Sequence, residues 1–115
     1  MIEPILYTYN AKFVRCIDGD TIVLDIDRGW CDRSIKTIRL ARINTPEIRG
    51  QEKERGIVAK SFVEQVLTTT EKITIQSRSL DSFGRSIAEV WYWGGLNWVN
   101  LSDLLLEKNL AKIFE

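Results

Sequence analysis

The sequence contains no histidine, and this absence excludes several kinds of active site. Serine and cysteine hydrolases with an imidazole base need a histidine, as do nucleases and metal sites that are built on imidazole. Any acid–base chemistry therefore depends on carboxylates, lysines or tyrosines. Cysteine is also scarce, because Cys16 and Cys31 are too few for a disulfide framework or a four-ligand zinc site. We expect both to be free thiols that pack in the interior.

Long apolar stretches and targeting signals are absent as well. No stretch approaches the roughly eighteen consecutive apolar residues of a membrane span, and the start, MIEPILYTYNAKF, has neither a basic leader nor a cleavage pattern. We therefore expect a soluble, cytoplasmic monomer with no membrane partner. The 115 residues, of which 44% are hydrophobic, suffice for one packed core and are too few for two. Residues 1–115 are thus interpreted as a single domain.

The charges balance over the whole chain but are unevenly distributed among its segments. Sixteen Lys and Arg residues match sixteen Asp and Glu residues, so the net charge makes no case for a nucleic-acid partner. Residues 28–60, however, carry a net charge of about +5, whereas the segments before and after them carry about −3 and −2. A local positive field attracts a polyanion, although ordinary solvated surface residues would give the same count.

Hydrophobic alternation and turn residues predict a small, mainly β, α+β domain. Strands are expected at 5–17, 21–27, 35–43, 71–79 and 86–93, with turns at Asp18-Gly19 and Gly94-Gly95. Apolar residues at helical spacing predict one helix at 51–68, and Asn100 can cap a short C-terminal helix. This order fits a five-stranded OB-fold barrel with a helix between strands three and four. An open sheet with both helices on one face is the alternative, and periodicity does not choose between them.

The tripeptide Asp18-Gly19-Asp20 is the first candidate for chemistry, because both carboxylates fall at a turn. Hard cations such as calcium prefer carboxylate and carbonyl oxygens. One of the two aspartates can bind such a cation directly, and the other can orient the ligands without touching the cation. A plain hairpin turn is the simpler interpretation of the tripeptide alone.

The segment RLARINTPE, residues 39–47, is the second candidate. It ends a strand with the amide of Asn44, the carbonyl of Thr45 and the carboxylate of Glu47, which can converge on one cation. Glu47 can act as a general base on a water molecule, and Arg39 offers a bidentate fork to a phosphate. An exposed strand end with ordinary surface charges is the competing interpretation.

The third candidate is DSFGR, residues 81–85, a turn that ends in Arg85 at the start of a strand. Phosphodiester hydrolysis develops negative charge on the phosphate oxygens, which two arginines and a divalent ion can stabilise. Arg85 is equally explained as a solvated charge beside a hairpin. Each segment is a weak signal, but all three in this order are a stronger one.

Five segments of the sequence resemble the thermonuclease, or staphylococcal nuclease-like, family in order and spacing. They are VRCIDGDTIVL, IRLARINTPE, EKERGIVAKSFV, LDSFGRSIAEVW and NLSDLLLEKNLAKIF, and together they span about residues 12–114. The resemblance implies an OB barrel with helices, which favours the barrel over the open sheet. It also implies a calcium-dependent endonuclease-type hydrolase that cuts DNA and/or RNA with little sequence preference and leaves 3′-phosphate ends.

The resemblance assigns roles residue by residue. The metal ligands it implies are Asp20, Asn44 and the carbonyl of Thr45. Asp18 would lie next to these ligands without binding the ion itself. The catalytic residues it implies are Arg39, Glu47 and Arg85: Glu47 acts on the attacking water, and the arginines clamp the phosphate.

Three features depart from the family pattern. Asn44 stands where a second metal carboxylate is common, so the site has one negative charge fewer. Phe83 stands where the best-studied member has a tyrosine, and we expect it to stack on a base of the substrate. The chain also stops at Glu115, without the longer C-terminal helix of some members. The tryptophans and Tyr92 near strand five are instead expected to pack in the barrel.

A nucleic-acid or protein binding module is the competing function, because some relatives keep the barrel and lose catalysis. Such modules are expected to lack several of the catalytic residues. Here Asp20, Arg39, Glu47 and Arg85 are all present, which favours the enzyme. A chain that is active only together with a partner domain is a third possibility.

Overall fold

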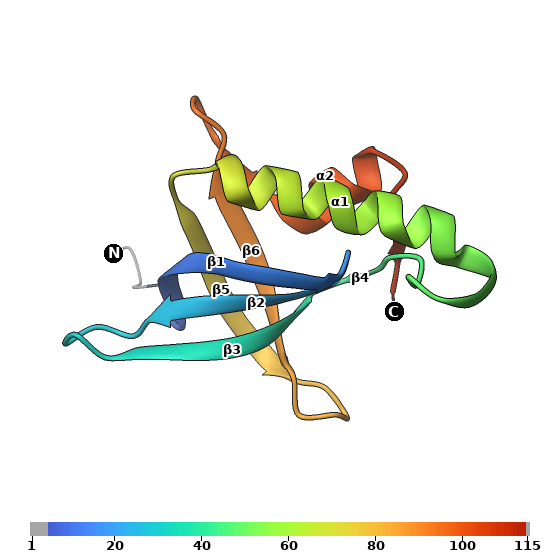
Figure 1. The fold of residues 1–115 in the computed structure, drawn as a ribbon. Coiled ribbons are helices and arrows are strands. Elements are labelled where there is room, and N and C mark those ends of the chain that lie inside the picture. Colours follow the sequence, from blue (N-terminus) through green and yellow to red (C-terminus); the bar gives the residue numbers. More distant parts are fainter. Residues whose placement is uncertain (1–4, 115) are drawn as a thin grey trace.

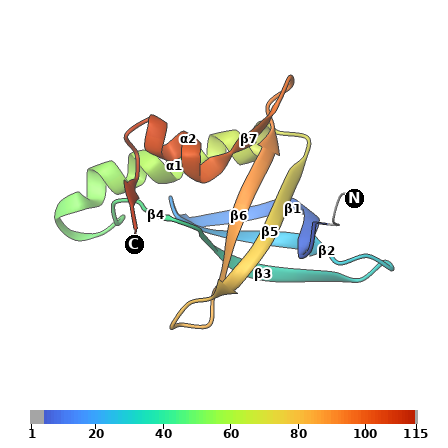
Figure 2. The ribbon, with the colours of Figure 1, turned by 180° about the vertical axis from the view of Figure 1, so that it is seen from behind.

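The computed structural model describes residues 5–114 of the chain. It is mainly β, with two helices (Figures 1 and 2). In chain order the elements are β1 (Thr8–Asp18), β2 (Thr21–Asp27), β3 (Arg33–Leu40), β4 (Ile43–Asn44), a 3-10 turn (Gly50–Glu52), α1 (Lys53–Thr69), β5 (Ile73–Leu80), β6 (Ser86–Trp93), β7 (Trp98–Asn100), α2 (Leu101–Glu107) and β8 (Lys112–Ile113).

Five strands close into a barrel. The first three form an antiparallel meander, β5 returns to pair with β1, and β6 pairs with β5. Closure comes from a parallel pairing of β3 with β6, in which Arg39 lies opposite Ile87. The predicted OB-fold barrel is therefore confirmed, and the open sheet is wrong. This pairing also brings the end of β3, with Arg39, beside the start of β6, just after Arg85.

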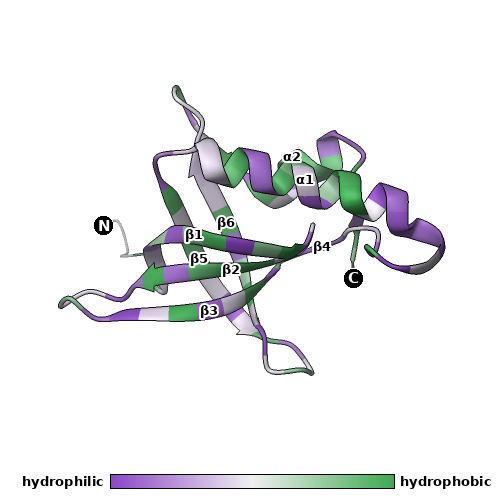
Figure 3. Cartoon of the chain, viewed as in Figure 1, coloured by the Kyte–Doolittle hydropathy of each residue, from purple (hydrophilic) through white to green (hydrophobic). Residues whose placement is uncertain are grey.

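The core fills the barrel and the space beneath the helices. On β2, Ile22, Leu24 and Ile26 are buried as the alternation predicts, and Asp25 and Asp27 on the other face are half-exposed, but Val23 on that other face is buried as well. Helix α1 packs on β1 and α2 packs on β6. Helix α1 carries both apolar and polar residues (Figure 3), and its buried residues Ala59, Val63 and Leu67 recur every four positions, as one face of an amphipathic helix does. The helices contribute the buried residues Ala59, Val63, Leu67, Leu101 and Leu105.

One predicted strand is broken in a way that matters for the site. The sequence predicts an unbroken strand at 35–43, but β3 ends at Leu40 and β4 begins at Ile43. Arg42, between them, has a φ of 71°, a left-handed conformation that a strand cannot contain. The residues after it consequently leave the barrel and pair with β8.

Smaller differences concern turns and exposure. The first strand starts at Thr8 and not at residue 5, and the Gly94-Gly95 turn is part of a four-residue connection closed by a bond from Gly94 N to Asn97 O (2.9 Å). Cys16 is buried as expected, but Cys31 is exposed. Trp98, expected to be packed, is 47% exposed. Within residues 5–114, no helix is long and apolar enough to cross a membrane.

Candidate functional site

One cavity of about 800 Å³ lies where the β1–β2 turn, the end of β3, the β5–β6 turn and the C-terminal segment meet. It gathers residues that are far apart in the sequence. All eight residues singled out from the sequence line it: Asp18, Asp20, Arg39, Asn44, Thr45, Glu47, Phe83 and Arg85. The three candidate segments thus share one cavity.

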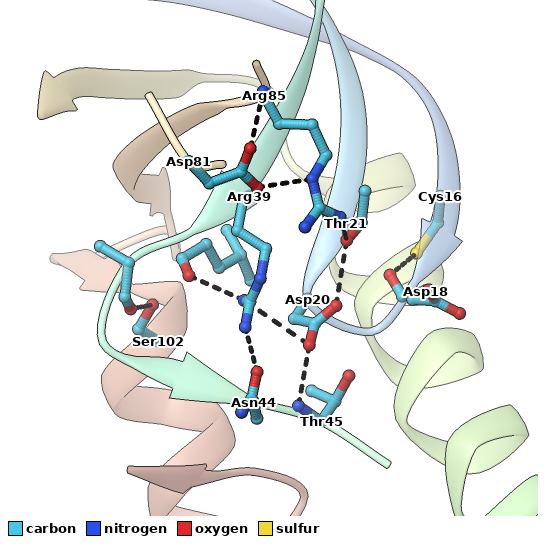
Figure 4. Close-up of polar contacts among 12 residues, drawn as sticks. Cys16, Asp18, Asp20, Thr21, Arg39, Asn44, Thr45, Asp81, Arg85 and Ser102 are labelled. Atoms are coloured by element: carbon cyan, nitrogen blue, oxygen red, sulfur yellow. Dashed lines mark hydrogen bonds and ion pairs between the residues drawn. The ribbon is translucent and has the colours of Figure 1, made fainter. Parts of the chain in front are cut away.

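Asp20 lines the cavity, and its carboxylate lies between Thr21, Thr45 and Arg39 (Figure 4). Its Oδ2 accepts a hydrogen bond from the backbone N–H of Thr45 (3.0 Å), and its Oδ1 accepts one from the hydroxyl of Thr21 (3.0 Å). The carboxylate is therefore held in one orientation from both sides. The β1–β2 turn and the segment after β4 are joined through this side chain.

Two glycines let α1 approach the acidic loops closely. A Cβ at Gly19 would lie 2.9 Å from Cβ of Ala59 and 3.0 Å from Oγ1 of Thr45. A Cβ at Gly56 would lie only 2.1 Å from the backbone oxygen of Glu47. Such contacts are impossible without displacement, so both positions depend on the absence of a side chain. The absence of a side chain at Gly56 thus lets the backbone of Glu47 lie directly against α1.

Arg39 lies between the candidate metal ligands. Its Nη1 donates to the backbone oxygen of Leu40 (3.0 Å) and is 3.5 Å from Oδ2 of Asp20. Its Nη2 donates to Oδ1 of Asn44. The side chain is only 11% exposed, so the guanidinium is directed into the site rather than into solvent.

Asp81 holds the second arginine. Its Oδ2 accepts from Nε of Arg85 (2.7 Å), and its Oδ1 accepts from the backbone N–H groups of Phe83 and Arg85 (2.9 Å each). Although burial alone would raise the pKa of Asp81, these hydrogen bonds lower it overall. Nη1 of Arg85 is directed toward the hydroxyl of Thr21 (3.5 Å), which itself bonds to Asp20. The two arginines are thus linked through Thr21 and Asp20.

The other carboxylates add to the negative field. Burial raises the pKa of Asp18, and the nearby charges of Asp20 and Glu47 raise it further. The three acids therefore interact electrostatically. Cys16 donates a hydrogen bond to the backbone oxygen of Asp18 (2.9 Å), and burial raises the pKa of its thiol to about 12. Such a thiol stays protonated at neutral pH and is a poor metal ligand. Glu47 is exposed, and the described part of the chain offers it no ion pair.

The donor atoms suit a hard cation. The cavity offers the carboxylate of Asp20, the amide oxygen of Asn44 and the backbone of Thr45, all of them oxygen donors. The hydroxyl of Thr45 is buried and finds no hydrogen-bond partner among residues 5–114, so it can still bond to a water molecule or an ion. Among the same residues no group of three or more His, Cys, Asp or Glu residues could hold a metal ion. The donor set therefore fits an oxygen-seeking ion but carries little negative charge.

Each arginine lies over an exposed aromatic ring. Arg85 lies 5.5 Å from the ring centre of Phe83, and Arg39 lies 5.7 Å from that of Phe114. The two rings are 82% and 57% exposed. Phe83 was expected here, but sequence reasoning missed Phe114, because its place depends on the pairing of β8 with β4. It also missed Asp81, whose position at the start of a turn that ends in Arg85 was an available signal.

Two comparisons with known proteins show what the chain is similar to. The family model described as "Staphylococcal nuclease homologue" matches residues 37–115. An uncharacterised protein of Methanocaldococcus jannaschii is 25% identical over 128 residues, covering 92% of this chain and 59% of that protein. The chain thus spans about three fifths of the length of the curated relative that it matches.

The family match begins inside β3 and covers the segments that carry Arg39, Glu47 and Arg85. The turn with Asp20 precedes the matched residues, so its place in the site follows from its contacts with Thr45 and Thr21. Because the match includes well over half of the chain, the chain belongs to the staphylococcal nuclease homologue family.

Proposed function

We propose that this protein is a calcium-dependent phosphodiesterase that hydrolyses DNA and/or RNA with little sequence preference and leaves 3′-phosphate ends. One observation carries the proposal: Asp20, Arg39, Glu47 and Arg85, from three separate segments of the chain, line one cavity. Family membership supports nuclease chemistry, and the oxygen donors support the choice of ion. All these groups come from one chain, so the reaction needs no second copy.

Asp20, Asn44 and the backbone oxygen of Thr45 would hold the calcium ion. When bound, the ion supplies positive charge to the phosphate and lowers the pKa of a bound water molecule. Asp18 would not bind the ion, but its carboxylate adds negative charge near Asp20. Its raised pKa reflects burial first and then its interaction with Asp20 and Glu47.

The arginines bind and orient the scissile phosphate. Arg39 and Arg85 come from neighbouring ends of the parallel strands β3 and β6, so both guanidinium groups reach the same cavity. Each presents a planar set of N–H donors to the phosphate oxygens, where negative charge builds up during attack. Asp81 keeps Arg85 in place through the 2.7 Å bond to Nε. Of the terminal nitrogens, Nη1 makes only the long contact with Thr21 (3.5 Å), so the outer edge of the guanidinium can turn to a phosphate.

Glu47 takes the proton of the attacking water. Its carboxylate is exposed at the cavity wall, and the backbone behind it is fixed by its close approach to Gly56. Water attacks phosphorus and gives its proton to Glu47, the bond between phosphorus and the 5′ oxygen breaks, and the 5′ oxygen leaves as a hydroxyl after taking a proton from solvent water. Glu47 then returns its proton to solvent. The 3′ oxygen keeps the phosphate, which gives the proposed product ends.

Low sequence preference follows from the kind of contacts offered. The charged groups of the cavity suit phosphates, which carry no sequence information. Phe83 and Phe114 offer exposed rings on which any base can stack. DNA and RNA are therefore both suitable substrates.

A binding module without catalysis is the second candidate. It is favoured by Asn44, which lowers the negative charge of the metal site and accepts a hydrogen bond from Arg39. In that case the cavity would bind a polyanion without cleaving it.

The test is to incubate the purified chain with 5′-labelled single-stranded DNA and RNA, with calcium and then with excess chelator. We expect cleavage in calcium only, and products whose mobility changes after treatment with a 3′-phosphatase. Cleavage that persists in chelator contradicts the metal. Binding without cleavage in calcium assigns the chain to the binding modules.

A further inference from the structure

Arg42 lies in the turn between β3 and β4 and has no part in the proposed reaction. Its guanidinium contacts three other elements. It donates to both carboxylate oxygens of Glu89 on β6 (2.7 and 2.9 Å), to Asp103 on α2 (2.9 Å) and to Asn100 at the end of β7 (3.2 Å). A single side chain thus ties the turn to the barrel and to the closing helix.

The main partner of Arg42 is buried. Glu89 is only 4% exposed, and Asn100 donates a further hydrogen bond to its Oε1 (3.1 Å). A buried carboxylate is costly unless it is paired and hydrogen-bonded. The bidentate contact with Arg42 meets that need and restricts the arginine to one geometry.

The backbone of the same turn makes hydrogen bonds with three other segments. The buried hydroxyl of Ser102 donates to the backbone oxygen of Ala41 (2.8 Å), and the N–H of Ala41 donates to Ala88 on β6 (2.9 Å). The N–H of Phe114 donates to the backbone oxygen of Arg42 (2.9 Å). The turn therefore joins the barrel, α2 and the C-terminal segment.

The backbone of Arg42 is itself strained. Its φ of 71° lies in the left-handed region, which glycine adopts freely and an arginine does not. The side-chain contacts with Glu89 and Asp103 must offset this strain. The turn directly precedes β4, so its conformation sets the direction in which Asn44 and Thr45 leave the barrel.

We propose that Arg42 is a positioning residue, which holds the β3–β4 turn so that Asn44 and Thr45 face Asp20. The contact that reports this is the 3.0 Å hydrogen bond from the N–H of Thr45 to Asp20. The geometric part of the proposal stands on contacts alone. Its consequence for turnover rests on the proposed function.

The test compares two arginines that each pair with two carboxylates. The double variant Arg42→Gly, Glu89→Gln removes the anchor, relieves the left-handed strain and leaves no buried unpaired charge, because Asp103, the other partner of Arg42, is exposed. The control is Arg33→Gln, because Arg33 pairs with Asp25 and Asp27 at the other end of β3 (3.0 and 3.7 Å). If the double variant does not fold, Arg42→Lys replaces it, since it keeps the charge opposite Glu89 and loses the planar fork.

The first measurement is amide hydrogen exchange by NMR on the full chain, which needs no activity. We expect the Thr45 amide to exchange at least about tenfold faster in the double variant, after correction for the change seen at core amides such as that of Leu24. Arg42→Lys is expected to give a smaller increase, and Arg33→Gln none. The second measurement is turnover at saturating substrate and calcium, which should fall while KM changes little.

The outcomes separate this proposal from the proposed function. If Thr45 loses protection only in proportion to the core amides, Arg42 stabilises the fold alone and the positioning role is wrong. If the wild-type chain does not cleave but Thr45 responds as expected, the nuclease proposal fails and the positioning role stands. If Thr45 responds and turnover does not, Arg42 does not position groups that matter for turnover, and that part of the proposal is overturned.

Discussion

The backbone N–H of Thr45 bonds to Oδ2 of Asp20 over 3.0 Å, although the two residues lie 25 positions apart. This contact joins the β1–β2 turn to the segment that follows β4. The other oxygen of Asp20 accepts from Thr21, whose hydroxyl lies 3.5 Å from Arg85. Because these contacts form one continuous line, a change at one end is expected to affect groups at the other.

Restoring a carboxylate at position 44 should strengthen calcium binding. Asn44→Asp adds a negative charge beside Asp20, and the affinity of oxygen-ligand sites rises with the number of charged ligands. We expect the dissociation constant for calcium, measured by calorimetric titration, to fall by at least about tenfold. Asn97→Asp, which adds the same charge in the β6–β7 loop outside the cavity, is the control. An equal or weaker affinity in Asn44→Asp would count against Asn44 as a ligand.

Replacing either clamping arginine by lysine should reduce turnover more than substrate affinity. Arg39→Lys and Arg85→Lys keep the charge but lose the planar fork, whose contacts strengthen as charge builds up on the phosphate. We expect turnover to fall by about a hundredfold with a much smaller change in KM. Arg33→Lys, outside the cavity, should behave as the wild type. Near-normal turnover in either variant would remove that arginine from the site.

A methyl group at position 56 should disturb Glu47. Gly56→Ala would normally stabilise a helix by about 1 kcal/mol, but here its Cβ would lie 2.1 Å from the backbone oxygen of Glu47. We expect the free energy of unfolding to fall by about 1–3 kcal/mol in urea titrations, and turnover to fall as well. Ser61→Ala, at an exposed position of the same helix, should change neither by much. A stabilised and fully active Gly56→Ala variant would contradict the close packing of these segments.

Acid should weaken the fold through Glu89. Burial alone would raise its pKa, but the hydrogen bonds from Arg42 and Asn100 lower it below the ordinary value of 4.5. A carboxylate whose pKa is lowered by folding stabilises the native state above its ordinary pKa, and this contribution disappears as the pH falls through the folded-state pKa. Urea unfolding between neutral and acid pH should therefore show a decline below about pH 4.5 that is less steep in Glu89→Gln. Asp81, whose pKa is also lowered, accounts for part of the remaining slope.

Much of the fold could be predicted from local patterns. Alternation along 21–27 and helical spacing along 51–68 depend on which side chains are buried, and burial follows the period of each element. The break at Arg42 could not be predicted, because its left-handed backbone is stabilised by Glu89 and Asp103, which are 47 and 61 positions away. No residue near Arg42 in the sequence indicates those partners.

The candidate site, like the fold, could be predicted from the sequence only in part. The residues expected to carry chemistry stand at strand ends and turns, where the sequence marks them with aspartates, Pro46 and glycines. That they line one cavity depends on the parallel pairing of β3 with β6, which no local pattern reports. Phe114 enters the cavity only because β8 pairs with β4, an interaction of two-residue strands that periodicity cannot detect.

Glu47→Gln should distinguish an enzyme from a binding module. The substitution keeps the size and hydrogen-bonding capacity of the side chain and removes the charge that accepts a proton, so turnover should fall strongly. The fold and the affinity for single-stranded nucleic acid should persist, because the arginines of the cavity are unchanged, and binding should weaken with added salt. Parallel measurements of cleavage rate and equilibrium binding check this, with Glu54→Gln, at the exposed start of α1, as the control. If Glu47 were only a solvated residue, its substitution would change stability by less than about half a kcal/mol and would leave cleavage unaltered.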